Sequence, residues 1–104
     1  MIIYEVNCLV DDAIVEPFKA WLQPHVAAVL ASDGFLSAEV LDLTVDERLT
    51  ARPYSTGFSI RYRIVGQSAL DHYLLHLAPV LRRDALDRFG NQYMAYRRVL
   101  KEQD

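Results

Sequence analysis

The chain has 104 residues and a net charge of −3, and 52% of its residues are hydrophobic and 24% charged. These values are typical of one globular domain, and the acidic balance provides no basic field to attract nucleic acid or anionic lipid. No apolar run is long enough to span a membrane, and the N-terminus lacks the basic segment of a secretory signal, so we expect a cytoplasmic protein. The single cysteine, Cys8, excludes an internal disulfide.

The first three predicted elements are a strand, a helix and a strand. Ile2–Val10 alternates between two faces, which is the pattern of a strand covered on one side. Apolar residues recur at helical spacing over 14–30 and form one stripe, within which Pro24 predicts a kink. Ser32-Asp33-Gly34 ends this helix with a turn. Phe35–Val45 then alternates again and predicts a second strand.

The second half of the chain predicts a strand, a helix and a strand. Residues 46–53 form a charged connection, and Tyr54–Val65 alternates as a third strand. Ser68-Ala69-Leu70-Asp71 resembles a capping box and starts the second helix, in which Pro79 predicts another kink. Tyr93–Leu100 is the last strand.

The order β-α-β-β-α-β predicts an α+β, ferredoxin-like sandwich for residues 1–104 as a single domain. In this fold the first and third strands are central in a four-stranded antiparallel sheet, and both helices cover one face. The residues expected on the covered face are Tyr4, Val6, Leu36, Val40, Tyr54, Phe58, Ile60 and Tyr62. The apolar residues expected on the uncovered face are Ile3, Leu9, Phe35 and Leu41.

Polar and charged side chains also alternate onto the uncovered face, and these are the candidate ligand-binding residues. They are Glu5, Asn7, Glu39, Ser59, Arg61 and Arg63. Two interpretations are open. The face supports a homodimer, with its charges paired across strands or between subunits, or it lines a cavity that orients a small polar or anionic ligand, for which arginine is well suited. The two are compatible, because two such sheets packed face to face close into a barrel around a cavity.

Several segments together resemble one known family. They are IIYEVN, FKAWLQPH, DGFLSAEV, YRI, SALDHYL, LAPVLRRDALDRFGNQY and RRVL. They resemble a small bacterial family of domains of unknown function in the dimeric α/β-barrel, ferredoxin-like superfamily. That resemblance implies the fold and a homodimer but no activity. The wider superfamily contains antibiotic-biosynthesis-type monooxygenases, haem-degrading enzymes, chlorite-dismutase-like proteins and stress-responsive barrels, among which fold alone does not choose.

Two enzymatic alternatives follow from the superfamily. Haem-degrading relatives carry an asparagine, a tryptophan and a histidine at set places; Asn7 and His76 lie in the corresponding elements, but the third strand has no tryptophan. A cofactor-independent monooxygenase acting on an aromatic or quinone-type substrate would need a dry pocket with one or two oriented polar groups. Asn7, Arg61 and Tyr96 are the residues that we would examine first for that activity.

The remaining chemistry-bearing residues favour structural roles. His72 and His76 lie four apart on the helix face opposite the core, with no third ligand nearby in sequence. Cys8 faces the core and is expected to be inert, and Trp21 is expected to be an anchor in the core or the dimer interface. Arg61 and Arg63 stand where an RNA-recognition domain needs aromatic and apolar residues. The sequence predicts no metal, no cofactor, no nucleic acid and no membrane partner.

Overall fold

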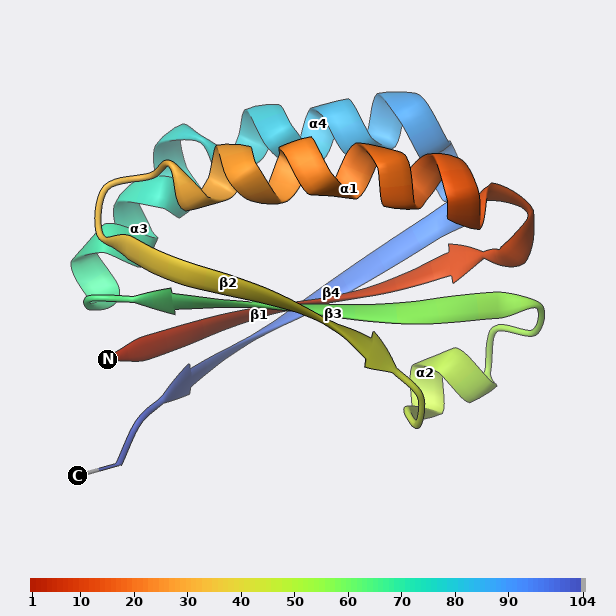
Figure 1. Ribbon diagram of the computed structural model, residues 1–104, viewed down its shortest axis with the longest axis horizontal. Coiled ribbons are helices and arrows are strands. Elements are labelled where there is room, and N and C mark those ends of the chain that lie inside the picture. The colour runs from red at the N-terminus through yellow and green to blue at the C-terminus, as the bar shows by residue number, and fades with distance from the viewer. Residues whose placement is uncertain (104) are drawn as a thin grey trace.

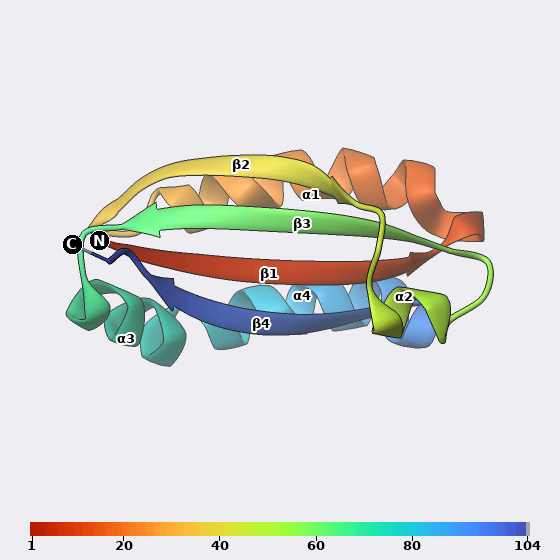
Figure 2. The same cartoon turned by 90° about the horizontal axis from the view of Figure 1, so that it is seen from below.

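The computed structural model describes residues 1–103 and confirms the α+β, ferredoxin-like fold. The strands are β1 (Ile2–Asp11), β2 (Phe35–Leu43), β3 (Ser55–Ile64) and β4 (Tyr93–Lys101). The helices are α1 (Val15–Leu30), α2 (Glu47–Thr50), α3 (Gln67–His76) and α4 (Ala78–Phe89), with 3₁₀ turns at Asp12–Ile14 and Gly90–Gln92. The sheet is antiparallel in the order β2-β3-β1-β4, so β1 and β3 are central as predicted (Figure 2).

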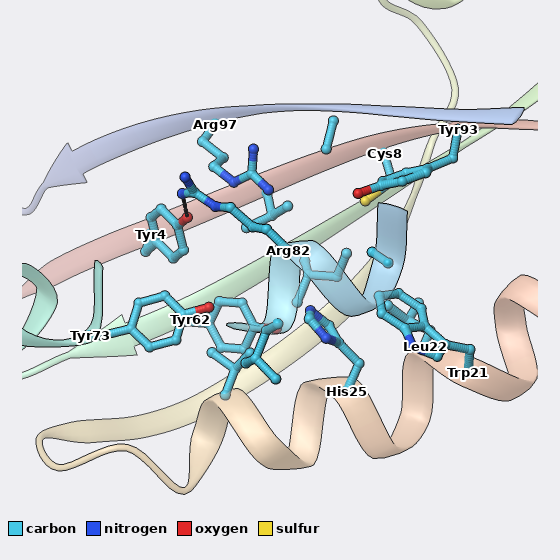
Figure 3. A pocket seen from close by; sticks show the side chains of 16 residues that line it. Tyr4, Cys8, Trp21, Leu22, His25, Tyr62, Tyr73, Arg82, Tyr93 and Arg97 are labelled. Carbon is cyan, nitrogen blue, oxygen red and sulfur yellow. Dashed lines mark hydrogen bonds between the residues drawn. The ribbon is translucent and has the colours of Figure 1, made fainter. Parts of the chain in front are cut away.

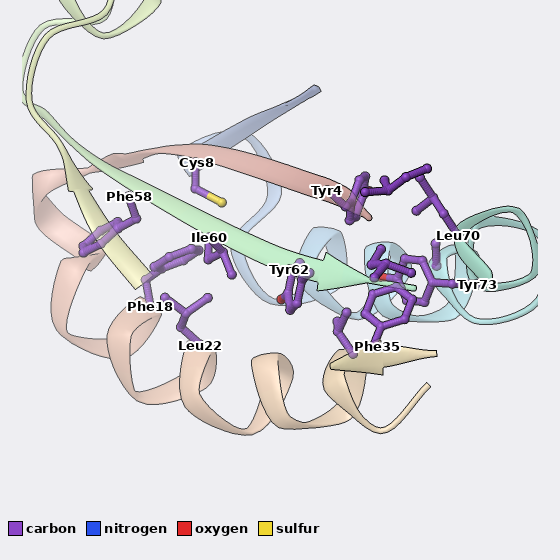
Figure 4. Packing of buried hydrophobic residues seen from close by; sticks show 14 of the residues in the cluster. Tyr4, Cys8, Phe18, Leu22, Phe35, Phe58, Ile60, Tyr62, Leu70 and Tyr73 are labelled. Atoms are coloured by element: carbon purple, nitrogen blue, oxygen red, sulfur yellow. The ribbon is translucent and has the colours of Figure 1, made fainter. Parts of the chain in front are cut away.

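Three helices cover one face of the sheet, and the short helix α2 lies on the other (Figure 1). The core between α1, α3, α4 and the sheet is rich in aromatic rings (Figure 4). The Phe18 ring of α1 stacks on Phe58 of β3 with 5.5 Å between centroids, and Tyr4 and Tyr62 stack across β1 and β3 at 6.2 Å. Each fully buried ring of this kind contributes roughly 1.5–3 kcal/mol, so these rings fix the face that the strands present to the helices.

A β-bulge at the start of β2 shows that the predicted faces of Phe35 and Leu36 are wrong. Phe35 pairs with Ile64 but Ser37 pairs with Arg63, so the register shifts between Phe35 and Ser37. The extra residue turns Phe35 into the core, where it is 8% exposed, and leaves Leu36 at 53% exposed. Strict alternation gave the opposite assignment, because it cannot register an inserted residue.

Tyr54 is also misplaced by the sequence pattern. It precedes β3, has a φ of 58° and is 86% exposed, so it belongs to the turn rather than to the core face. A positive φ at a bulky residue is uncommon. It ends the extended backbone, so the alternation of side chains between two faces does not include Tyr54. Val40 pairs with Ile60 and so lies on the covered face, as predicted. It is nevertheless 49% exposed, because β2 is an edge strand.

The second predicted helix is two helices, α3 and α4, separated at Leu77. Helix α1 continues through its interior Pro24. In the second predicted helix, the chain instead places proline in the first turn of a new helix, where it costs no backbone hydrogen bond. The chain therefore ends α3 and starts α4 at Ala78, with Pro79 as the second residue of α4, so a break replaces the predicted kink. The predicted capping box is wrong: α3 begins at Gln67, whose side chain donates to Asp71 Oδ1 at 2.9 Å. Neither these helices nor the others within residues 1–103 are long and apolar enough to cross a membrane.

The connection over 46–53 forms α2 and is tied to the far end of the sheet. Asp46 caps the helix by accepting from the Arg48 backbone N–H at 2.8 Å. The Arg52 guanidinium donates to Asp11 Oδ1 at 3.0 Å and to the Asn91 carbonyl at 2.8 Å. These contacts place α2 beneath the end of the sheet where β1 stops and β4 begins (Figure 2).

Candidate functional site

The strand register arranges the uncovered face in rows of four side chains, one from each strand. One row is Glu39, Arg61, Glu5 and Arg98, in the order β2, β3, β1, β4, and it alternates in charge. The next row toward α2 is Leu41, Ser59, Asn7 and Tyr96. Two neighbouring rows therefore gather five of the six predicted site residues, all except Arg63.

Glu5 is the centre of this arrangement. Its side chain is only 2% exposed, yet it accepts three hydrogen bonds. Oε1 accepts from Arg98 Nε at 2.7 Å and from Asn7 Nδ2 at 2.9 Å, and Oε2 accepts from Arg61 Nε at 3.1 Å. Burial alone would raise the pKa of Glu5, but these bonds and the two positive charges outweigh it and keep the pKa below its ordinary value. The carboxyl is therefore ionised at neutral pH.

The network continues to Ser59. Asn7 is 2% exposed and Ser59 is 6% exposed. Ser59 Oγ donates to Asn7 Oδ1 at 2.8 Å, which fixes the orientation of the amide so that Nδ2 points to Glu5. A buried chain of hydrogen bonds thus links β3, β1 and β4, and it presents the two arginines in a defined position.

The α2 segment forms one wall of the site. The Tyr96 hydroxyl donates to Asp46 Oδ2, and the Arg48 guanidinium carbon lies 3.9 Å from the centre of the Tyr96 ring. The bond from Tyr96 keeps the pKa of Asp46 below its ordinary value, whereas burial and the same bond raise the pKa of Tyr96. This wall and the Glu5 network together line an open cleft of about 360 Å³.

Glu39 and Arg63 lie outside this cleft. Together with Arg61 they line a second, slightly smaller hollow of about 320 Å³ toward the other end of the face. Arg63 forms an ion pair with Glu102, which follows β4. Arg61 pairs with Glu39 in the strand register, but its side-chain hydrogen bond goes to Glu5.

A separate pocket lies on the other side of the sheet, between α1, α4 and the strands (Figure 3). It is narrow, with a volume of about 40 Å³, and its walls are mainly aromatic and aliphatic. Its polar or titratable lining residues are Tyr4, Cys8, His25, Tyr62, Tyr73, Arg82, Tyr93 and Arg97. Trp21 stacks on His25 with 4.3 Å between ring centroids, and its indole N–H donates to Asp84 Oδ2 at 2.9 Å.

The other residues considered from the sequence lie where they were expected. Cys8 is buried, and burial raises the pKa of its thiol to about 12, so the thiolate needed for nucleophilic chemistry does not form at neutral pH. His72 and His76 are exposed on α3, with their ring centroids 4.3 Å apart. Within residues 1–103, no third His, Cys, Asp or Glu joins this pair into a group of metal-ligating side chains.

Comparison with known proteins identifies the family. The family model described as "Domain of unknown function (DUF4286)" matches residues 1–103. The chain belongs to this family. No curated protein matches the chain in sequence.

Solved structures similar to this DUF4286 chain share its fold. A candidate antibiotic biosynthesis monooxygenase from Deinococcus radiodurans is 19% identical, with a TM-score of 0.69 over 100% of this chain and 94% of that one. SnoaB, a cofactor-independent oxygenase from Streptomyces nogalater, is 11% identical, with a TM-score of 0.66 over 99% and 94%. An ethyl tert-butyl ether D (EthD) family protein from Bacillus halodurans is 10% identical, with a TM-score of 0.65 over 99% and 100%.

The sequence reasoning missed part of the site. Arg98 supplies the shortest bond to Glu5, and strict alternation along the last strand places it on the same face as Tyr96, so that signal was available. Asp46 and Arg48 carry no such signal, because their position depends on α2 folding back under the sheet. The alternation of residues along a strand predicts which face each side chain occupies. It does not predict which part of the sheet a connecting segment covers.

Proposed function

We propose that this protein binds a small polar or anionic molecule in the cleft over Glu5, and that it does so as a homodimer. The observation that carries the proposal is the arrangement of Arg61 and Arg98. Each guanidinium gives its Nε–H to Glu5, and within residues 1–103 its terminal nitrogens make no hydrogen bond. Two guanidinium groups thus share one buried carboxylate and direct their remaining donors to the cleft.

The chemistry of these donors favours a carboxylate or phosphate. A guanidinium presents a planar fork of N–H groups that matches two oxygens of such a group. Glu5 pairs with both guanidinium groups and balances one of their two positive charges. Asp46, which also lines the cleft, adds a negative charge that acts on Arg98. Arg61 and Arg98 are 42% and 58% exposed, so a ligand reaches them without a rearrangement of the sheet.

The homodimer is supported by apolar residues on the same face. Leu41 and Met94 are each 39% exposed and Leu100 is 37% exposed, and the register places all three on the face of Glu5. A second copy packed sheet against sheet would cover these side chains and close the cleft into a cavity. The cytoplasmic location expected from the sequence remains a prediction.

A thermal-shift titration with inorganic phosphate and with malonate tests the binding site, alongside light scattering on a gel-filtration column. We expect a dimer that is stabilised by at least one of these anions. Arg61→Ala should leave the dimer intact and abolish the stabilisation, while Arg83→Ala, which removes an exposed i,i+4 ion pair with Asp87, should change neither. If Arg61→Ala dissociates the dimer, the face is an interface rather than a binding site. A monomeric native protein would refute the closed cavity.

The alternative function is a cofactor-independent monooxygenase acting on an aromatic or quinone-type substrate. It is supported by the likeness in fold to SnoaB and by the narrow, largely apolar pocket beneath the helices. The test is oxygen uptake with a panel of phenols and hydroquinones, corrected for the rate without protein. Loss of uptake in Asn7→Ala or Tyr96→Phe would assign the activity to the Glu5 face, and no uptake above the uncatalysed rate would exclude the activity for that panel.

A further inference from the structure

Two arginines enter the pocket beneath the helices without a carboxylate partner. Arg97 pairs with Val6 across β4 and β1, so its side chain projects to the helix-covered face of the sheet. Arg82 extends from α4, and its Nη2 donates to the Tyr4 hydroxyl at 3.2 Å. Within residues 1–103 neither guanidinium forms a salt bridge. Figure 3 shows both side chains extending into the pocket from opposite walls.

The surroundings of these cations do not neutralise them. Burial raises the pKa of the Tyr73 phenol to about 12, and Arg82 and Arg97 both lie near enough to oppose that rise. The Cys8 thiol is likewise neutral at pH 7. Burial also lowers the pKa of His25, so its imidazole is neutral and carries no negative charge in any state.

Asp84, the carboxylate whose charge acts on His25, is already engaged. Asp84 raises the pKa of His25 slightly against the effect of burial. However, its Oδ2 accepts from Trp21 at 2.9 Å and its Oδ1 accepts from Arg88 at 3.0 Å. Arg97, which is partly buried, and Arg82, which is exposed, therefore both line this pocket without a paired carboxylate. An anion between the two guanidinium groups would be attracted by both positive charges.

The walls of the pocket indicate the rest of the ligand. Trp21 and His25 stack on each other on α1, with 23° between their planes, and both rings line the pocket. The pocket volume of about 40 Å³ corresponds to roughly three or four waters, since one water needs about 10–15 Å³ by this measure. A cavity that holds benzene has about 150 Å³, so an aromatic ring enters this pocket only if the pocket widens. Arg82 is exposed on α4 and is held by one bond, so its rotation would widen the mouth.

We propose that this pocket is a binding site for a small organic anion with a planar apolar body, of the class of aromatic carboxylates. The carboxylate lies between Arg82 and Arg97, and the ring lies toward Trp21 and His25. This site is on the opposite side of the sheet from the Glu5 cleft, so the inference goes beyond the proposed function and stands or falls separately from it.

The test is a titration with benzoate and, as an uncharged control of the same shape, with benzamide. Trp21 is the only tryptophan and lines the pocket, so its fluorescence reports occupancy directly, and calorimetry gives the affinity. We expect benzoate to bind and to change Trp21 emission, and benzamide to bind at least tenfold more weakly, because it lacks the charge that the guanidinium groups recognise.

Variants assign the binding to the two cations. Arg97→Gln and Arg82→Gln should each weaken benzoate binding at least tenfold, while Arg97→Lys should fall between Arg97→Gln and the native protein. Arg83→Gln, one residue along α4 and paired with Asp87 outside the pocket, should bind as the native protein does. Arg98→Gln, the neighbour of Arg97 on the other face, separates the two sites: benzoate held in the Glu5 cleft would be lost in this variant, whereas the change in Trp21 emission reports the pocket beneath the helices.

Three results would overturn the proposal. The first is no benzoate binding by the native protein, and the second is benzamide binding as tight as that of benzoate. The third is native affinity in both glutamine variants, with circular dichroism confirming that they are folded. If Arg97→Gln does not fold, benzoate binding by Arg82→Gln is the deciding measurement. Arg82 is exposed on a helix, so we expect this variant to fold. Loss of binding in Arg98→Gln but not in Arg97→Gln would move the site to the Glu5 cleft.

Discussion

Replacing the buried carboxylate of Glu5 by an amide should destabilise the protein more than any other neutral, same-size change on the uncovered face. In Glu5→Gln, one of the two carboxylate oxygens becomes an NH₂ group that faces a guanidinium. Hydrogen bonds to a charged group contribute roughly 1.5–3 kcal/mol each, and Glu5 accepts three. Because Arg61 and Arg98 are 42% and 58% exposed and regain water, we expect a net loss of about 2 kcal/mol.

The assay is urea unfolding at pH 7 at one fixed protein concentration, with Glu39→Gln as the matched control. Glu39 stands in the same row, is exposed, and has no salt bridge within residues 1–103, so its replacement should change the free energy of unfolding by no more than about 0.5 kcal/mol. For a domain of this size, the loss in Glu5→Gln corresponds to roughly 10 °C in Tm. Equal stability of the two variants would refute the reasoning.

The pH dependence gives the same prediction an independent check. The folded-state pKa of Glu5 is lowered from 4.5, so the unfolded chain takes up the proton first as the solution is acidified. The stabilisation by Glu5 is therefore present in full above pH 4.5 and is lost as the pH falls through the lowered pKa. Glutamine does not titrate, so the difference in stability between native and variant should narrow in acid. If the difference in unfolding free energy between the native protein and Glu5→Gln widens below pH 4.5, the lowered pKa of Glu5 is wrong.

Two further predictions concern close packing and the buried thiol. Gly57→Ala should destabilise by about 1–3 kcal/mol, because its new Cβ would lie 2.5 Å from the Leu43 carbonyl oxygen. Gly66→Ala meets nothing within 4 Å and should cost less, since it loses only the preference for glycine over alanine at the N-cap of α3; equal effects in thermal melts would refute the packing argument. Cys8, with its pKa raised to about 12, should react with a thiol reagent at pH 8 only as fast as the protein opens, and labelling as rapid as in urea would contradict its burial.

The fold was predictable because its determinants are local and periodic. The alternation of apolar and polar residues identifies β1 and β3, and the apolar stripe identifies α1. The order β-α-β-β-α-β then leaves few possible topologies. The errors came from single residues that break a period. The bulge at Phe35, the positive φ of Tyr54 and the separation of α3 from α4 at Leu77 each depend on backbone geometry, which apolar spacing does not encode.

The candidate site was predictable only where strands build it. Glu5, Asn7, Ser59 and Arg61 are brought together by register, and a correct strand order is sufficient to place them. The wall formed by α2 depends on how a loop folds back, and the pocket beneath the helices depends on how far α1 and α4 stand from the sheet. These are tertiary distances, which a sequence pattern does not carry.

Arg97 and Arg98 are adjacent on β4, yet their charges have opposite consequences for stability. Arg98 compensates the buried Glu5, so Arg98→Gln should lower the free energy of unfolding. Arg97 shares its pocket with Arg82 and no paired carboxylate within residues 1–103, so Arg97→Gln should be neutral or stabilising without ligand. Low salt should enlarge both effects, because screening weakens partly exposed charges. Chemical unfolding in low and high salt measures this contrast. A loss in Arg97→Gln as large as that in Arg98→Gln would show that Arg97 has a partner in the folded protein and would remove the reason for an anion in its pocket.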